Sequence, residues 1–108
     1  MPINSRQKGA AGEREWAKFI RKMWGALTAR RGCQFAGGPD SPDVTGIPGL
    51  HCEVKRTETF NAYKAMSQAI RDSGNNTPYI AYRKNCESWL IIIQADDVLK
   101  FVKAINEL

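Results

Sequence analysis

Residues 42–56 read PDVTGIPGLHCEVKR, and this stretch predicts a β-hairpin. Its centre, residues 45–49, combines glycine and proline in the way that is typical of a turn. Residues 43–45 and 50–56 read as the two strands that the turn joins. The chain is therefore expected to double back here, which brings the two strands side by side.

The charged side chains of this hairpin fall into a specific arrangement. Because side chains alternate between the two faces of a strand, Glu53 and Lys55 point to one face. Cys52 and Val54 point to the other face. Since the chain doubles back, we expect Asp43 to lie beside Glu53, so that two carboxylates and an amine converge.

Two converging carboxylates predict a bound cation. At a separation of about 4 Å they repel each other by about 4 kcal/mol at an effective dielectric constant of about 20, and a divalent cation reverses this cost. Asp40 also follows a proline, and its spacing to Glu53 does not by itself exclude it. We favour Asp43 because residues 44–45 continue as a strand, whereas Asp40 lies in a glycine-rich loop.

The other elements follow from the spacing of apolar residues. Apolar residues three and four apart predict helices, and short apolar or β-branched runs predict strands. We expect one α/β domain over residues 1–108, with a central mixed β-sheet flanked by helices in the order α-β-β-β-α-β-β-α. The predicted helices span residues 11–24, 62–73 and 97–108, and the predicted strands span residues 27–30, 43–45, 50–56, 79–82 and 89–93.

One acid stands within the apolar stripe of the first predicted helix. At about 100° per residue, Glu13 projects between Trp16 and Ala17. A buried acid without a partner costs free energy, so Glu13 is either functional or paired with a structural partner. Both interpretations stay open at the level of sequence.

Histidine and tryptophan offer further candidates with simpler explanations beside them. His51 shares its strand face with Glu53 and could donate to a phosphate, but a lone histidine at the start of a strand is more often a surface residue. Trp16, Trp24 and Trp89 fit a hydrophobic core better than platforms for stacking bases.

The net charge of +5 is unevenly distributed along the chain. Residues 1–35 hold eight Lys or Arg and two acids, whereas residues 36–108 hold eight Lys or Arg and nine acids. A basic N-terminal part suits a polyanion such as nucleic acid. The alternative is a solvated helix face.

Several protein classes are excluded by composition. No apolar run approaches the roughly 18 residues of a membrane span, and no apolar stretch typical of a secretory signal follows the N-terminal basic residues. Three cysteines without a Cys-x-x-Cys pair argue against a disulfide framework and a structural zinc site. We therefore expect a cytoplasmic protein.

These features together resemble the PD-(D/E)xK nuclease superfamily, whose signature is read here as Pro42-Asp43 followed by Glu53-Val54-Lys55. The chain is similar in particular to the Holliday junction resolvase branch, as found in small nucleases of phages and prophages. The likeness covers most of the chain, through residues 9–15, 30–32, 41–44, 53–56, 68–69 and the strand of Trp89.

The resemblance implies a restriction-endonuclease-like fold and metal-assisted hydrolysis of a DNA phosphodiester. The cofactor would be Mg²⁺, with Mn²⁺ as a substitute, held by Asp43, Glu53 and the backbone carbonyl of Val54, while Glu13 adds a ligand or fixes a metal-bound water. Lys55 would orient the attacking water or neutralise the charge that develops on the phosphoryl oxygens. The expected DNA contacts are Arg6, Lys8, Arg30, Arg31, Ser41, Arg56, Lys64 and Gln68.

On these grounds we expect a Mg²⁺-dependent, structure-specific DNA endonuclease, and within that class a resolvase of four-way junctions, encoded by a phage or prophage and acting in a bacterial host. Symmetric cutting of a four-way junction needs two active sites related by a two-fold axis, which predicts a homodimer. Two alternatives remain: a nuclease for nicked, branched or flap DNA, and a basic DNA-binding module that does not cut.

Overall fold

The computed structural model describes residues 5–32 and 42–108, and its described elements follow the predicted order. A short 3₁₀ turn, η2, precedes the last helix. None of the helices in this described part is long and apolar enough to cross a membrane. The elements are α1 (Ser5–Met23), β1 (Arg30–Arg31), β2 (Val44–Thr45), β3 (Leu50–Arg56), α2 (Ala62–Asp72), β4 (Thr77–Arg83), β5 (Leu90–Ile93), η2 (Ala95–Asp97) and α3 (Val98–Asn106).

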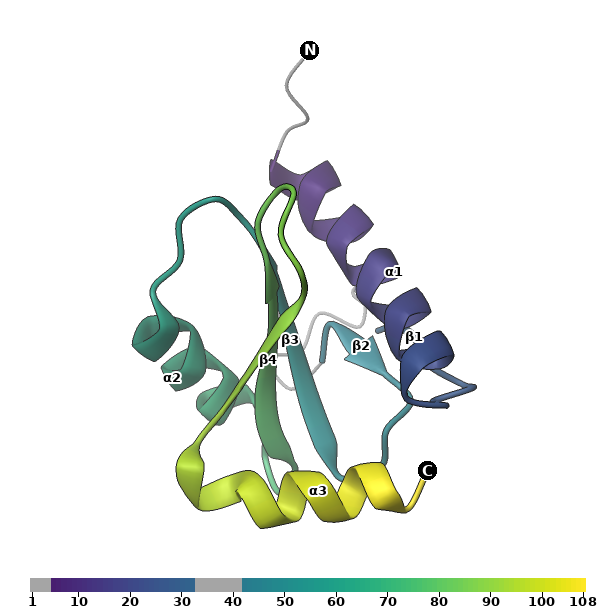
Figure 1. The fold of residues 1–108 in the computed structure, drawn as a ribbon. Helices are drawn as coiled ribbons and strands as arrows, with labels where there is room; N and C mark the ends of the chain where they lie inside the picture. The colour runs from purple at the N-terminus through teal and green to yellow at the C-terminus, as the bar shows by residue number, and fades with distance from the viewer. Residues whose placement is uncertain (1–4, 33–41) are drawn as a thin grey trace.

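The strands form one mixed sheet in the order β1-β2-β3-β4-β5 (Figure 1). β3 and β4 are parallel, and the other neighbouring pairs are antiparallel. Parallel strands cannot be joined by a tight turn, and α2 makes the crossover between β3 and β4. The α/β class, the element order and the mixed sheet are therefore confirmed.

Helices cover both faces of the central strands, with α1 on one side and α2 on the other (Figure 1). On the α1 side, Trp16 and Ile20 are buried against Cys52 and Val54 of β3 and Tyr79 of β4. The Trp16 indole N–H donates to the Tyr79 hydroxyl at 3.1 Å, which satisfies both groups inside the core. The core is thus built on the tryptophan that the sequence assigned to it.

The α2 side has its own small core. Ala65, Met66 and Ala69 of α2 are buried against Ile80 of β4, and Phe60 stacks on Tyr82 nearby. Because β3 lies in the middle of the sheet with a helix on each face, residues 50–54 are all buried. A central parallel strand commonly has both faces covered in this way.

Two predicted boundaries are wrong for local reasons. α1 begins at Ser5 rather than at residue 11. Residues 5–10 are largely polar, so they carry no apolar spacing from which this part of the helix could be predicted. The strand predicted at residues 27–30 is reduced to β1. Leu27 is exposed in a turn, where its N–H donates to the Gly25 carbonyl at 2.9 Å instead of to a neighbouring strand.

The turn between β2 and β3 depends on close contact with the segment after α1. Gly46 has φ of +120°, and a Cβ atom there would lie 2.5 Å from the Cα of Ala29. Ala29 is itself buried, so its backbone has little room to move away. Glycine at this position therefore allows the hairpin to pack against the segment that follows α1.

We predict that Gly46→Ala lowers the free energy of unfolding by about 2–5 kcal/mol, since backbone strain and overlap with Ala29 add together. Gly49→Ala is the matched control, because Gly49 also has a positive φ, of +88°, but a Cβ there meets nothing within 4 Å. We expect a loss of about 1–2 kcal/mol for the control. Urea unfolding measures both, and equal losses would contradict the role given to the Ala29 contact.

Candidate active site

The hairpin places Asp43 along the edge of β3. The Asp43 N–H donates to the Cys52 carbonyl at 2.8 Å, and Val44 pairs with Cys52 in the β2–β3 ladder. One carboxylate oxygen of Asp43, Oδ2, accepts the Val54 N–H at 2.8 Å. Asp43 is therefore held by β3 through its backbone and through its side chain.

Asp43 and Glu53 are brought together, as the hairpin predicted. Burial raises the pKa of Asp43 to about 7, helped by repulsion from the charge of Glu53 and, more weakly, by Glu13. A side-chain hydrogen bond with Glu53 acts in the same direction, and the hydrogen bond from the Val54 N–H opposes it. The site therefore concentrates negative charge in a region that water screens poorly.

Glu53 is held from its other side by a histidine. The Nε2 atom of His51 lies 3.0 Å from Oε1 of Glu53, and the exposed fractions of the two residues are 1% and 6%. The expectation that His51 is a surface residue is therefore wrong, because the central position of β3 buries the start of the strand as well. The i, i+2 spacing of His51 and Glu53 is the sequence signal for this contact.

Glu13 reaches the same region from α1 and is mostly buried. Its Oε1 accepts a hydrogen bond from Nε of Arg31 at 2.8 Å, and the exposed fraction of its side chain is 13%. A Cβ at Gly12 would lie 2.7 Å from the Cβ of Arg56, so the glycine before Glu13 permits the close approach of α1 to β3. Glu13 is thus paired structurally, and its charge still acts on Asp43.

Lys55 lies on the α2 side of the sheet, with Glu53 on the same strand face. The register pairs Glu53 with Ile80 and Lys55 with Tyr82, and both β4 residues belong to the α2 side. Lys55 lines a recess of about 180 Å³ between the end of β3 and α2. Two residues predicted to contact DNA, Lys64 and Gln68, line the same recess, together with Thr57, Thr59, Phe60, Asn61 and Ala65.

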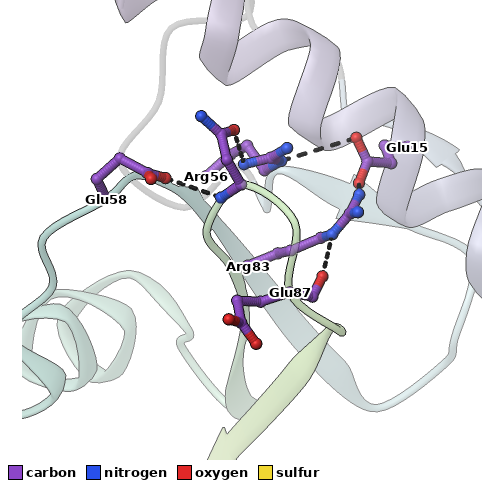
Figure 2. Close-up of polar contacts among 6 residues, drawn as sticks. Glu15, Arg56, Glu58, Arg83 and Glu87 are labelled. Atoms are coloured by element: carbon purple, nitrogen blue, oxygen red, sulfur yellow. Dashed lines mark hydrogen bonds and ion pairs between the residues drawn. The ribbon is translucent and has the colours of Figure 1, made fainter.

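Arg56, also predicted to contact DNA, takes part in an internal network (Figure 2). Its side chain has an exposed fraction of 14%, its Nε lies 3.7 Å from Oε2 of Glu15, and its Nη1 donates to Oδ1 of Asn85 at 3.0 Å. Arg83 donates to the same Glu15 carboxylate. This network connects α1 to the ends of β3 and β4. Contacts between residues so far apart in the sequence cannot be predicted from sequence spacing.

The remaining predicted DNA contacts are spread over the N-terminal part of the chain. Arg30 is exposed in β1, whereas Arg31 is occupied by Glu13. Ser41 lies outside the described residues, as do Asp40 and the side chains of Arg6 and Lys8. Their roles stay predictions.

The donor atoms present at the site fit a hard cation. Within residues 5–32 and 42–108, no group of three or more His, Cys, Asp or Glu residues is arranged to hold a metal ion. Mg²⁺, however, is commonly bound by one or two carboxylates with water and substrate phosphates completing the shell. The N–H and C=O of one strand residue point to the same side, so the Val54 carbonyl faces the side of β3 on which its N–H meets Asp43.

Comparisons with known proteins show a structural likeness to a solved nuclease. No family model matches the chain, and no curated protein matches it in sequence. Among solved structures, Hjc, a Holliday junction resolvase from the archaeal hyperthermophile Archaeoglobus fulgidus, is 20% identical, with a TM-score of 0.49 over 75% of this chain and 72% of that chain.

The raised pKa of Asp43 predicts how stability changes with pH. The folded state keeps a proton on Asp43 that the unfolded state releases above its ordinary pKa of 3.8. The contribution of this retained proton to the free energy of unfolding is therefore complete below about pH 4 and is lost as pH rises through about 7. The free energy of unfolding falls across this window.

Asp43→Asn should remove this dependence, because the amide carries no charge while its oxygen can still accept the Val54 N–H. At pH 8 in EDTA we expect the variant to be more stable than the wild type by about 1–3 kcal/mol, and at pH 4 nearly equal. Denaturant unfolding at both pH values measures the difference, with the exposed Asp96→Asn as control. A variant that is less stable than the wild type at pH 8 would contradict the account of Asp43.

Proposed function

We propose that this protein is a Mg²⁺-dependent DNA endonuclease. The observation that carries the proposal is the pair of carboxylates of Asp43 and Glu53, which are held together against their mutual repulsion, with Lys55 on the same strand face as Glu53. Folding gains nothing from such a pair, because burial and repulsion both act against its charged form. Bringing these acids together beside β3 is readily explained if a cation joins them during function.

The residues divide the chemistry among themselves. The cation would be held by the carboxylates of Asp43 and Glu53 and by the Val54 carbonyl. Glu13 would approach from α1, either as a further ligand or as a group that fixes a bound water. When bound, Mg²⁺ supplies polarisation of the phosphate and a lowered pKa of a bound water. The ammonium group of Lys55 orients the attacking water or neutralises the negative charge that develops on the phosphoryl oxygens.

Basic and polar groups near the site support a polyanionic substrate. Lys55, Lys64 and Gln68 line one recess on the α2 side, and Arg30 is exposed in β1. Lys64 and Gln68 are four residues apart and therefore neighbours on the face of α2. A phosphate backbone that passes along this side would meet two amines and an amide on the face of β3 that carries Glu53.

We propose a four-way junction as the substrate and a closed dimer as the active form. The resemblance of the sequence to the Holliday junction resolvase branch supports this choice, and paired cuts related by a two-fold axis need two copies of the site. The edge strand β5 is apolar along its length, and Leu90 and Ile91 are exposed with fractions of 57% and 39%. An exposed apolar edge of this kind is usually covered, and a second copy would cover it.

The proposed function differs from two alternatives in what the protein does to DNA. A nuclease for nicked, branched or flap DNA would use the same carboxylates on another substrate. A binding module without cleavage has no use for two carboxylates facing a polyanion, because they would repel its ligand.

Incubation with a labelled four-way junction and with plain duplex, in Mg²⁺ or in EDTA, separates these functions. We expect Mg²⁺-dependent paired nicks in opposite strands of the junction and no cleavage of the duplex. Single unpaired nicks on flaps or branched DNA would favour the other nuclease role and a monomer. Binding without cleavage at any Mg²⁺ concentration would reject the enzyme altogether.

Substitutions at the site test the roles of individual residues. We expect Asp43→Asn and Glu53→Gln to abolish cleavage, with a loss of at least about 100-fold, and Lys55→Gln to cause a loss of similar order. Binding of the junction in EDTA should be kept or improved in the two acid variants, since each removes a negative charge near the phosphates. Glu107→Gln and Lys103→Gln, which are exposed near the C-terminus, are the matched controls.

Cleavage rates and junction affinities, measured on the same preparations, separate a role in catalysis from a role in substrate binding. If Asp43→Asn or Glu53→Gln kept full activity, that residue would have no part in the mechanism. A loss of junction binding equal to the loss of cleavage would instead assign it to substrate binding or folding.

A further inference from the structure

His51 is the most deeply buried polar residue near the proposed site, and the mechanism above gives it no role. Its exposed fraction is 1%, and its Nε2 lies 3.0 Å from Oε1 of Glu53. The backbone that carries both residues is fixed, because β3 is paired in register with β4 from Leu50 to Arg56. The two side chains therefore meet across a rigid i, i+2 spacing on one strand face.

The chemistry of the contact sets its direction. An ionised carboxylate only accepts hydrogen bonds, so Nε2 of His51 must carry the hydrogen when Glu53 is charged. A glutamate side chain has three rotatable bonds, and a donor fixed in the core removes most of that freedom. One oxygen of Glu53 is then occupied by His51, and Oε2 is left for another partner.

The surroundings of Glu53 indicate which partner that is. The carboxyl group of Asp43 approaches the Glu53 carboxylate from the β2 side of β3. Burial and the charge of Glu53 both disfavour the charged form of Asp43. A purely structural role would be met as well by apolar residues at both positions, because replacing a whole buried polar pair by packed apolar side chains is often neutral or stabilising. A histidine that holds one oxygen of Glu53 instead suits a site in which the other oxygen must be aimed.

We propose that His51 is a positioning residue that donates its Nε2 hydrogen to Oε1 of Glu53 and so directs Oε2 toward the cation beside Asp43. The inference rests on the proposed function, because it concerns the same cation site. Partners that orient a ligating side chain typically change metal affinity by about 10–100-fold when they are removed. His51 would therefore act on metal affinity and leave the affinity for DNA unchanged.

Two amide substitutions separate positioning from packing. In His51→Gln the side-chain amide nitrogen can occupy the place of Nε2 and donate to Glu53. In His51→Asn the amide has the same chemistry but ends one methylene short, so it does not reach. We expect the Gln variant to retain the wild-type metal affinity within about 3-fold and the Asn variant to lose about 10-fold or more.

Metal affinity is measured in two ways on each folded variant. Calorimetric titration with Mn²⁺ alone reports binding without DNA, and the Mg²⁺ concentration for half-maximal junction cleavage reports the working enzyme. Junction binding in EDTA and thermal unfolding serve as controls for the DNA surface and the fold. His51→Leu adds a variant that fills space without a donor, and it should behave like the Asn variant.

The outcomes distinguish the inference from the function on which it rests. Weaker Mn²⁺ binding in the Asn and Leu variants, with rescue by Gln and unchanged junction binding, supports the positioning role. If the wild type binds Mn²⁺ or cleaves the junction and the folded Asn variant has the same metal affinity, the inference alone is overturned. The inference is also overturned if the Gln and Asn variants lose metal affinity equally. A wild-type protein that neither cleaves nor takes up Mn²⁺ overturns the inference and the proposed function together.

Discussion

Repulsion between the carboxylates of Asp43 and Glu53 is the constraint around which the rest of the molecule is arranged. Two acids placed side by side and removed from water would separate if their backbones were free to move. Asp43 is prevented from doing so by two hydrogen bonds to β3, one from its backbone N–H and one to its side chain. The strand that carries Glu53 is fixed in turn by β4 along its whole length.

The two helices on either side make this arrangement rigid. Trp16 and Ile20 of α1 pack on Cys52 and Val54, the two residues that flank Glu53 on β3 and face the opposite way. The same packing brings Glu13 to the site, where Arg31 accompanies it. The core and the site are therefore formed by alternate residues of one strand, so a substitution in the core also shifts the residues of the site.

Much of the fold could be read from the sequence because its signals are local. The turn in residues 45–49, the alternation along β3 and the apolar spacing of the helices each act within a few residues, and they led to the observed element order. The adjacency of Asp43 and Glu53 followed from the same hairpin. The sequence singles out Glu13, because an acid on an apolar stripe is costly, but no local pattern identifies its partner Arg31, which is 18 residues away.

The parts that could not be read depend on contacts between distant segments. The burial of His51 follows from the neighbours of β3 on both sides and both faces, which no single stretch of sequence specifies. The first turns of α1 are polar, so helix formation there left no periodic signal. The sequence around Leu27 predicts a strand, but short-range hydrogen bonds after α1 hold this residue in a turn.

The ion pairs of Figure 2 change how the positive charge of this chain should be counted. Arg56 and Arg83 share the carboxylate of Glu15, and Arg31 is matched with Glu13, so two carboxylates within the protein already act as counterions for three guanidinium groups. Arginines neutralised from within displace few cations from a nucleic acid backbone. The ionic-strength dependence of binding should accordingly be shallower than the sixteen Lys and Arg residues alone would imply.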